Sequence, residues 1–171
     1  MTDVLLIIDV QRALLDELGT ARADELVETL VPLVDRARAS GTPVVYVRHD
    51  GSPEELLPGT PSWEIAADIA PQPADPIVEK RSSDAFAGTR LSDVLAGLDA
   101  DHLITAGMQT DYCVNATIGG AIERGYRVTL VADGHATPAS GGRSEAEIRA
   151  AMHAANLERG ARIVSSSELF P

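Results

Sequence analysis

The sequence predicts an α/β protein in which helices cover both faces of one parallel sheet, giving three layers in the order α/β/α. Three observations lead to this fold class. Short apolar runs alternate with stretches of helical periodicity along the whole chain. The apolar runs are continuous, as expected for strands that are buried on both faces. At 171 residues, 44% of them hydrophobic, the chain can enclose a core of its own. We therefore expect one domain over residues 1–171, with right-handed crossovers.

The first half of the chain predicts three strands and a long helix. The strands are expected at residues 4–8, 44–47 and 77–80. Residues 20–40 repeat apolar side chains at helical spacing, and Pro32 should kink or restart that helix.

A proline-rich stretch from Gly51 to Pro76 separates the second and third predicted strands. It includes Pro53 and the only tryptophan, Trp63. A loop of this length in a compact domain is usually a lid or a binding loop.

The second half predicts three further strands, at residues 103–106, 128–131 and 162–164. Helices are expected between them. Thr89 can cap a short helix that precedes the first of these strands, and Ser144 with Glu147 forms a capping box for the helix that precedes the last.

The only cysteine of the chain lies where a predicted strand turns into a helix. Gly107 breaks the apolar run that ends at Ala106, and Asp111 is a candidate N-cap with Cys113 in the first turn behind it. Backbone N–H groups at such a turn point outward unpaired, and the helix dipole favours a thiolate. A nucleophile placed at this turn therefore has its oxyanion stabilisers built in.

Four chemically capable side chains follow the ends of predicted strands: Asp9, His49, Lys80 and Cys113. Ligands of open α/β sheets bind outside the carboxyl ends of the strands, so we expect these groups to converge. A thiol with a pKa of about 8.5 is only slightly ionised at neutral pH. We expect the Lys80 charge to stabilise the thiolate, and Asp9 to act as general base and then general acid.

Each of these residues also has a structural interpretation. A lone cysteine is most often a small buried hydrophobe, and an aspartate at a strand end can cap the following turn. Arg81, next to Lys80, could be the residue that points inward. His135 and His153 are interpreted as structural.

Several segments together resemble the isochorismatase-like cysteine hydrolases, a superfamily that includes nicotinamidases and N-carbamoylsarcosine amidases. The segments are Ile-Ile-Asp-Val-Gln at 7–11, Val-Glu-Lys at 78–80, Phe-Ala-Gly-Thr-Arg-Leu at 86–91 and Ala-Gly-Met-Gln-Thr-Asp-Tyr-Cys-Val-Asn-Ala-Thr at 106–117. The order of Asp, Lys and Gly-x-x-Thr-Asp-x-Cys-Val is more specific than any one segment.

The resemblance implies a six-stranded parallel sheet of order 3-2-1-4-5-6 and a catalytic triad of Asp9, Lys80 and Cys113. It further implies a cis peptide between Met108 and Gln109, with an oxyanion hole from the backbone N–H groups of Gln109 and Cys113. The implied activity is hydrolysis of an amide or carbamoyl C–N bond through a thioester.

Departures from the nicotinamidase branch narrow the expectation. That branch carries an Asp-x-His pair and further histidines after the second strand, whereas this chain offers Arg48-His49-Asp50 there and no other histidine before His102. We therefore expect no catalytic metal and no cofactor. Two alternatives stay open: a vinyl-ether hydrolase of the isochorismatase type with Cys113 idle, and a non-catalytic ligand-binding member.

Candidate substrate-binding residues are Gln11, His49, Trp63 and Phe86. For each the alternative is structural: Gln11 could support Asp9 or lie solvated in a turn, His49 could be a loop residue, and the two aromatics could pack the loop onto the body.

The charge and the cysteine content of the chain limit the kinds of partner and of covalent link that we expect. The net charge of −12 opposes binding to nucleic acid or to anionic membrane surfaces, and the N-terminal apolar run is too short to span a membrane. A single cysteine excludes an internal disulfide. We expect a cytoplasmic protein that acts on a small molecule. Gly119 and Gly120 within a predicted helix suggest close packing, and with the family resemblance they favour a homodimer or higher homo-oligomer.

Overall fold

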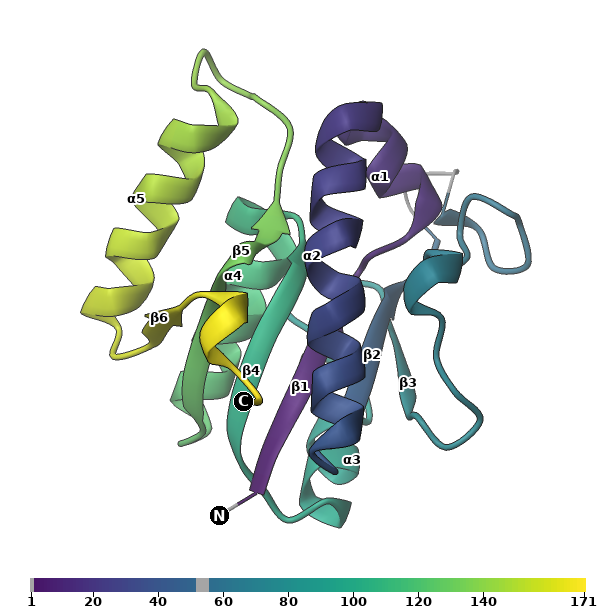
Figure 1. Ribbon diagram of the computed structural model, residues 1–171, viewed down its shortest axis with the longest axis vertical. Coiled ribbons are helices and arrows are strands. Elements are labelled where there is room, and N and C mark those ends of the chain that lie inside the picture. The colour runs from purple at the N-terminus through teal and green to yellow at the C-terminus, as the bar shows by residue number, and fades with distance from the viewer. Residues whose placement is uncertain (1, 52–55) are drawn as a thin grey trace.

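The computed structural model describes residues 2–51 and 56–171, so residues 52–55 of the proline-rich stretch, with Pro53, lie outside the described part. Within it, six strands form one parallel sheet in the order β3-β2-β1-β4-β5-β6 (Figure 1). This confirms the predicted fold class and strand order. The strands are β1 Thr2–Ile8, β2 Val44–His49, β3 Ile77–Lys80, β4 Ala100–Met108, β5 Arg127–Ala136 and β6 Arg162–Val164.

Helices cover both faces of the sheet. They are α1 Arg12–Leu18, α2 Thr20–Ala39, α3 Leu91–Gly97, α4 Asn115–Glu123 and α5 Glu145–Glu158. Along β1, Leu5 and Ile7 pack into the core beneath α1 and α2, whereas Val4, Leu6 and Ile8 pack into the core beneath α3 and α4. Because side chains alternate between the faces of a strand, a strand with two buried faces reads as an unbroken apolar run.

The helix α2 runs without interruption through Pro32, so the predicted restart at that residue is wrong (Figure 1). A proline inside a helix costs about 3 kcal/mol or more. The apolar side of α2 offsets this cost, because Leu26, Leu30 and Leu33 are fully buried while Pro32 faces solvent. The short helix α1 was not predicted; Gly19, with a φ of 77°, separates it from α2.

The capping box of α5 is present as predicted, with Ser144 and Glu147 bonded reciprocally. Thr89 also meets its prediction in part, since its hydroxyl accepts the backbone N–H of Leu91 at 3.1 Å although Arg90 occupies the N-cap position of α3.

The sheet places the carboxyl ends of β3, β2, β1 and β4 side by side. Ile8 of β1 is in register with Gly107 of β4, and His49 of β2 with Lys80 of β3. Gly107 has a φ of 127°, and a Cβ atom there would overlap the carbonyl oxygen of Ile8. This close approach requires glycine and brings the chain after β4 next to the chain after β1. None of the helices in residues 2–51 and 56–171 is long and apolar enough to cross a membrane.

Candidate active site

Three separate stretches of the chain meet at this edge of the sheet. Asp9 follows β1, Lys80 ends β3, and Cys113 lies in the turn between β4 and α4. The Lys80 ammonium nitrogen lies 2.7 Å from Asp9 Oδ2 and 3.2 Å from Cys113 Sγ. The Asp9 and Lys80 side chains have no solvent exposure, whereas Cys113 is partly exposed. Arg81, the other basic residue here, is exposed, so Lys80 is the inward cation.

The ammonium of Lys80 contacts four groups of the site. Besides Asp9 and Cys113, its nitrogen lies 2.9 Å from the carbonyl oxygen of Ser82 and 3.0 Å from Nδ1 of His49. Ser82 and Cys113 accept hydrogen bonds from this nitrogen, the role of His49 Nδ1 depends on its tautomer, and Asp9 is held as an ion pair. Lys80 therefore links the carboxylate to the thiol.

Burial dominates the protonation of the two acids. Desolvation raises the pKa of Asp9 even though Lys80 acts in the opposite direction. Desolvation, and then the charge of Asp9, raise the pKa of Cys113 to about 12 against the opposing effect of Lys80. Lys80 lowers the pKa of the thiol, as its charge predicts, but its effect is smaller than those of burial and of Asp9. In the resting site Cys113 is a thiol at neutral pH, and a thiolate requires its proton to move to a nearby base.

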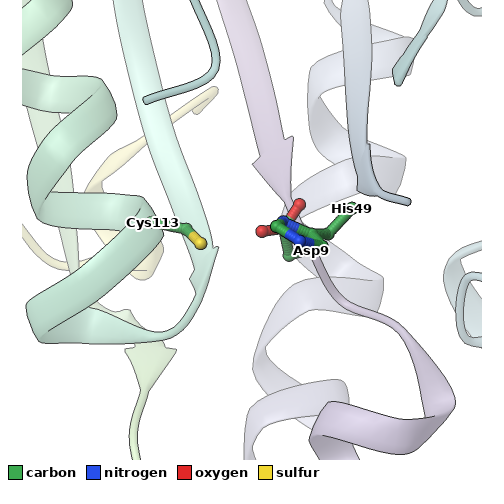
Figure 2. Close-up of side chains that lie close together, drawn as sticks. All are labelled: Asp9, His49 and Cys113. Atoms are coloured by element: carbon green, nitrogen blue, oxygen red, sulfur yellow. The ribbon is translucent and has the colours of Figure 1, made fainter. Parts of the chain in front are cut away.

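Asp9, His49 and Cys113 form a group whose ligand atoms all lie within 4.8 Å of one another (Figure 2). Nitrogen, oxygen and sulfur donors of this kind suit a borderline-soft divalent cation. The Lys80 ammonium, however, contacts all three at 2.7 to 3.2 Å. A metal ion could share the three donors only if Lys80 were displaced, so the residues as arranged enclose an ammonium.

The turn that carries Cys113 differs from the predicted capped helix. Residues Thr110–Val114 form a π-helical turn that leads into α4, and the preceding Met108–Gln109 peptide is cis. Gln109 occupies the N-cap position, and the carboxylate of Asp111 accepts a 2.7 Å bond from the hydroxyl of Thr137. The prediction that Asp111 caps the helix is therefore wrong, because Thr137 holds its carboxylate instead.

Gln11 is fully buried and bonded to the backbone on both sides of the site. Its side-chain nitrogen donates to the carbonyl oxygens of His49, at 3.0 Å, and Trp63, at 2.8 Å, and its oxygen accepts the N–H of His49 at 2.8 Å. These bonds tie the end of β2 to the proline-rich stretch, and they fix the backbone of His49 beside Lys80.

The two aromatic candidates are built into the scaffold. The indole N–H of Trp63 donates to Asp50 at 2.8 Å, and the Arg48 guanidinium lies 3.3 Å from the ring centroid. Phe86 stacks on Tyr126 with ring centroids 5.9 Å apart. Both rings are more than nine-tenths buried. Of the four candidate substrate-binding residues, His49 has a side chain that contacts Lys80 and groups with Asp9 and Cys113.

Sequence reasoning missed two groups that shape the site. The carbonyl oxygen of Ser82 receives a bond from Lys80, but a backbone acceptor leaves no signal in a residue pattern. Thr110, directly after Gln109, is buried and hydrogen-bonded to His135 at 2.8 Å. Its place in the Gly-x-x-Thr-Asp-x-Cys-Val segment was the signal that could have identified it.

Comparisons with known proteins agree with this geometry. Residues 3–168 match the sequence model of the isochorismatase domain. The chain is 38% identical over 146 residues to streptothricin hydrolase from Streptomyces noursei, an alignment that covers 82% of this chain and 58% of that protein. The chain thus spans about half the length of these curated relatives.

Solved structures share the whole fold. A crystal structure of an isochorismatase from Pseudomonas putida KT2440 superposes with a TM-score of 0.88 at 31% identity, covering 98% of this chain and 89% of that one. The N-carbamoylsarcosine amidase of Thermoplasma acidophilum superposes with a TM-score of 0.83 at 26% identity over 99% of both chains.

Proposed function

The chain belongs to the isochorismatase family, and from this premise we propose that it is a cysteine-dependent hydrolase of amide or carbamoyl C–N bonds in a small molecule. The observation that carries the proposal is the contact of one buried ammonium, Lys80, with both a buried carboxylate and the only thiol of the chain. Relatives named as a hydrolase and an amidase support the class of reaction.

In the proposed mechanism Asp9 is the base, Cys113 the nucleophile and Lys80 the fixed counter-charge. Moving the thiol proton to Asp9 turns a carboxylate and a thiol into a carboxylic acid and a thiolate, so the net charge of the buried group stays constant. Burial favours this exchange in one respect, because it raises the pKa of Asp9 and makes it a stronger base. Since the pKa of Cys113 is about 12, the thiolate forms only as sulfur attacks the substrate carbon.

Attack by Cys113 Sγ on the carbonyl carbon forms a C–S bond and places negative charge on the carbonyl oxygen. The backbone N–H groups of Gln109 and Cys113 are proposed to donate to that oxygen. Asp9 then returns its proton to the departing nitrogen as the C–N bond breaks, leaving a thioester and a free amine. Water attacks the thioester with Asp9 again accepting a proton, which restores the thiol and releases the acid.

Lys80 keeps the Asp9 and Cys113 side chains in position throughout the reaction. Its hydrogen bond to Cys113 allows its charge to stabilise the thiolate as it forms. His49, which contacts Lys80, is proposed to contact the substrate as well. Gln11 and Trp63 hold the end of β2 and the proline-rich stretch in place, and Phe86 stacks on Tyr126 in the core that also contains Val114 and Ile118. No metal or cofactor takes part in this scheme.

We further propose that residues 1–171 act as one domain, in a cytoplasmic homodimer or larger homo-oligomer. Size-exclusion chromatography with light scattering tests the assembly.

The test is a panel of small amides and carbamoyl compounds, with isochorismate included as a vinyl ether. The proteins are the wild type, Cys113→Ala and Asp9→Asn, with Arg81→Met as the control for altering a neighbouring exposed residue. We expect ammonia or amine release by wild type and Arg81→Met and none by the other two. Turnover of the vinyl ether that survives in Cys113→Ala but not in Asp9→Asn would replace this proposal with the isochorismatase reaction. Absence of turnover together with tight ligand binding would identify a non-catalytic member.

A further inference from the structure

A second polar chain lies behind the turn that carries Cys113. The Thr110 hydroxyl is 2.8 Å from Nδ1 of His135, and Nε2 of His135 is 2.8 Å from Nε2 of His153. Thr110 and His135 are buried, whereas His153, on α5, is partly exposed. The chain of hydrogen bonds therefore runs from the surface of α5 to the residue that directly follows Gln109.

The pair of imidazoles can share only one proton along its hydrogen bond. When both rings are neutral, one Nε2 donates and the other accepts. If His135 donates from Nε2, its Nδ1 accepts from the Thr110 hydroxyl; if it accepts at Nε2, its Nδ1 donates to Thr110. In both arrangements the Thr110 side chain is held, and a change at His153 reverses the direction of every bond as far as Thr110.

The charges around the pair favour the neutral state. Arg22 of α2 donates to the carbonyl oxygen of His135 at 3.2 Å and pairs with Glu145 of α5 at 2.9 Å. Burial, and then His153, Arg149 and Arg22, lower the pKa of His135 to about 3 against the opposing effect of Asp133.

On its own side, burial and then Arg149 lower the pKa of His153. The one nearby acid on β5, Asp133, has its carboxylate bonded to the backbone and hydroxyl of Ser166 at 2.7 Å. Only protonation of both rings would set N–H against N–H at Nε2; with a single added proton on His153 the link is kept and its direction is fixed.

We propose that Thr110, His135 and His153 are positioning residues that set the oxyanion turn and couple its geometry to the protonation of His153 at the surface. This inference rests on the proposed function, because it assigns the turn an oxyanion role. The end of β5 anchors the turn at two points: His135 is hydrogen-bonded to Thr110, and Thr137, directly after the strand, is hydrogen-bonded to Asp111. Protonation of His153 makes its Nε2 the donor, so His135 accepts at Nε2 and donates from Nδ1; the Thr110 hydroxyl then becomes the acceptor of that bond, and the Gln109 N–H shifts relative to the reacting oxygen.

Catalysis gives the first test, with matched variants at both ends of the chain. Thr110→Val keeps the shape and removes the hydroxyl; we expect kcat to fall by about 10-fold or more, with KM within about 2-fold, because a small misplacement of a catalytic donor acts on the transition state. Thr110→Ser keeps the hydroxyl and should stay near wild type. His153→Gln keeps a polar atom near the position of Nε2 but cannot titrate. It should retain kcat at neutral pH and lose less of it on acidification than the wild type.

The proposal would be overturned if Thr110→Val had the same kcat as Thr110→Ser. It would also be overturned if the kcat of His153→Gln fell on acidification in the same way as that of the wild type does. An NMR titration then separates failure of this inference from failure of the proposed function, since it needs no turnover. We expect the Gln109 and Cys113 amide resonances of the wild type to shift with the protonation of His153, and to lose that shift in His153→Gln. Shifts that persist unchanged in His153→Gln would contradict the coupling even if a substrate were known.

Discussion

Replacing Lys80 with methionine removes the ammonium and leaves the Asp9 carboxylate buried without its counter-charge. The attraction between the two charges, 2.7 Å apart, is about 6 kcal/mol at an effective dielectric constant of about 20, before desolvation is subtracted. Breaking a buried pair typically destabilises a protein by about 3 to 5 kcal/mol. Asp9 can limit the loss by taking up a proton, which at pH 7 costs about 4 kcal/mol for a carboxyl with an unfolded pKa of about 3.9.

The direction in which the stability of Lys80→Met changes with pH follows from this uptake of a proton by Asp9. In Lys80→Met the folded pKa of Asp9 lies further above its unfolded value than in the wild type. A raised folded pKa gives stability at low pH that is lost as pH rises, by up to about 1.4 kcal/mol per unit. We therefore expect the stability deficit of Lys80→Met in urea unfolding to be larger at pH 7 than at pH 5. Its hydrolytic activity should be lost at both, because a protonated Asp9 cannot act as a base.

Two further variants control this experiment. Arg81→Met changes the neighbouring exposed residue, and its unfolding free energy should stay within about 0.5 kcal/mol of the wild type. Asp9→Asn combined with Lys80→Met removes both charges and should be more stable at pH 7 than Lys80→Met alone. If Lys80→Met unfolded at the same urea concentration as Arg81→Met at both pH values, the buried ion pair would not hold the site together.

Three other perturbations have defined outcomes. In thermal or urea unfolding, Gly107→Ala should prevent folding or lower stability by more than about 3 kcal/mol, because its Cβ would overlap the backbone of the neighbouring strand. Its control, Gly119→Ala, should be neutral or stabilising by up to about 1 kcal/mol, because the nearest atom is the end of an arginine side chain at 3.8 Å. Asp9→Asn should shift the pH midpoint of Cys113 alkylation by iodoacetamide to lower pH, because the carboxylate that raises the thiol pKa is gone while the lysine remains; an unchanged midpoint would refute the contact. The folded pKa of His135, about 3, lies below its unfolded value of about 6.5, so its contribution to stability should be complete above pH 6.5 and fall by about 2 kcal/mol by pH 5; a His135→Gln variant with the same loss over this range would contradict that assignment.

The parallel sheet and the convergence of Asp9, Lys80 and Cys113 could be predicted because they follow from local patterns and a general rule, whereas the strand order was implied by the family resemblance. Continuous apolar runs mark strands with two buried faces, and parallel strands end at the same edge of the sheet. The uninterrupted α2 could not be predicted from Pro32 alone, since propensity is overridden by the burial of the apolar side of the helix.

The pKa values and hydrogen-bond partners of the site residues were harder to predict than the identity of those residues. Sequence position identifies Lys80 as a cation near Cys113, but the pKa of the thiol depends on how deeply the pocket is dehydrated, which is a property of the folded chain. The same holds for Gln11 and Trp63, whose partners are backbone carbonyls and a carboxylate brought near by the proline-rich stretch. Asp111 had the residue type of a helix cap, yet Thr137, 26 positions away, holds its carboxylate.

Trapping the acyl intermediate tests the central claim most directly. An amide hydrolysed by the wild type is mixed with the enzyme, the reaction is quenched in acid within the first turnover, and the protein is digested for mass spectrometry. The mechanism predicts the acyl mass on the peptide that contains Cys113, lost again on treatment with neutral hydroxylamine, and no such mass in Asp9→Asn. Turnover with Cys113 unmodified, or with the acyl group on another residue, would contradict the role of this thiol as the nucleophile.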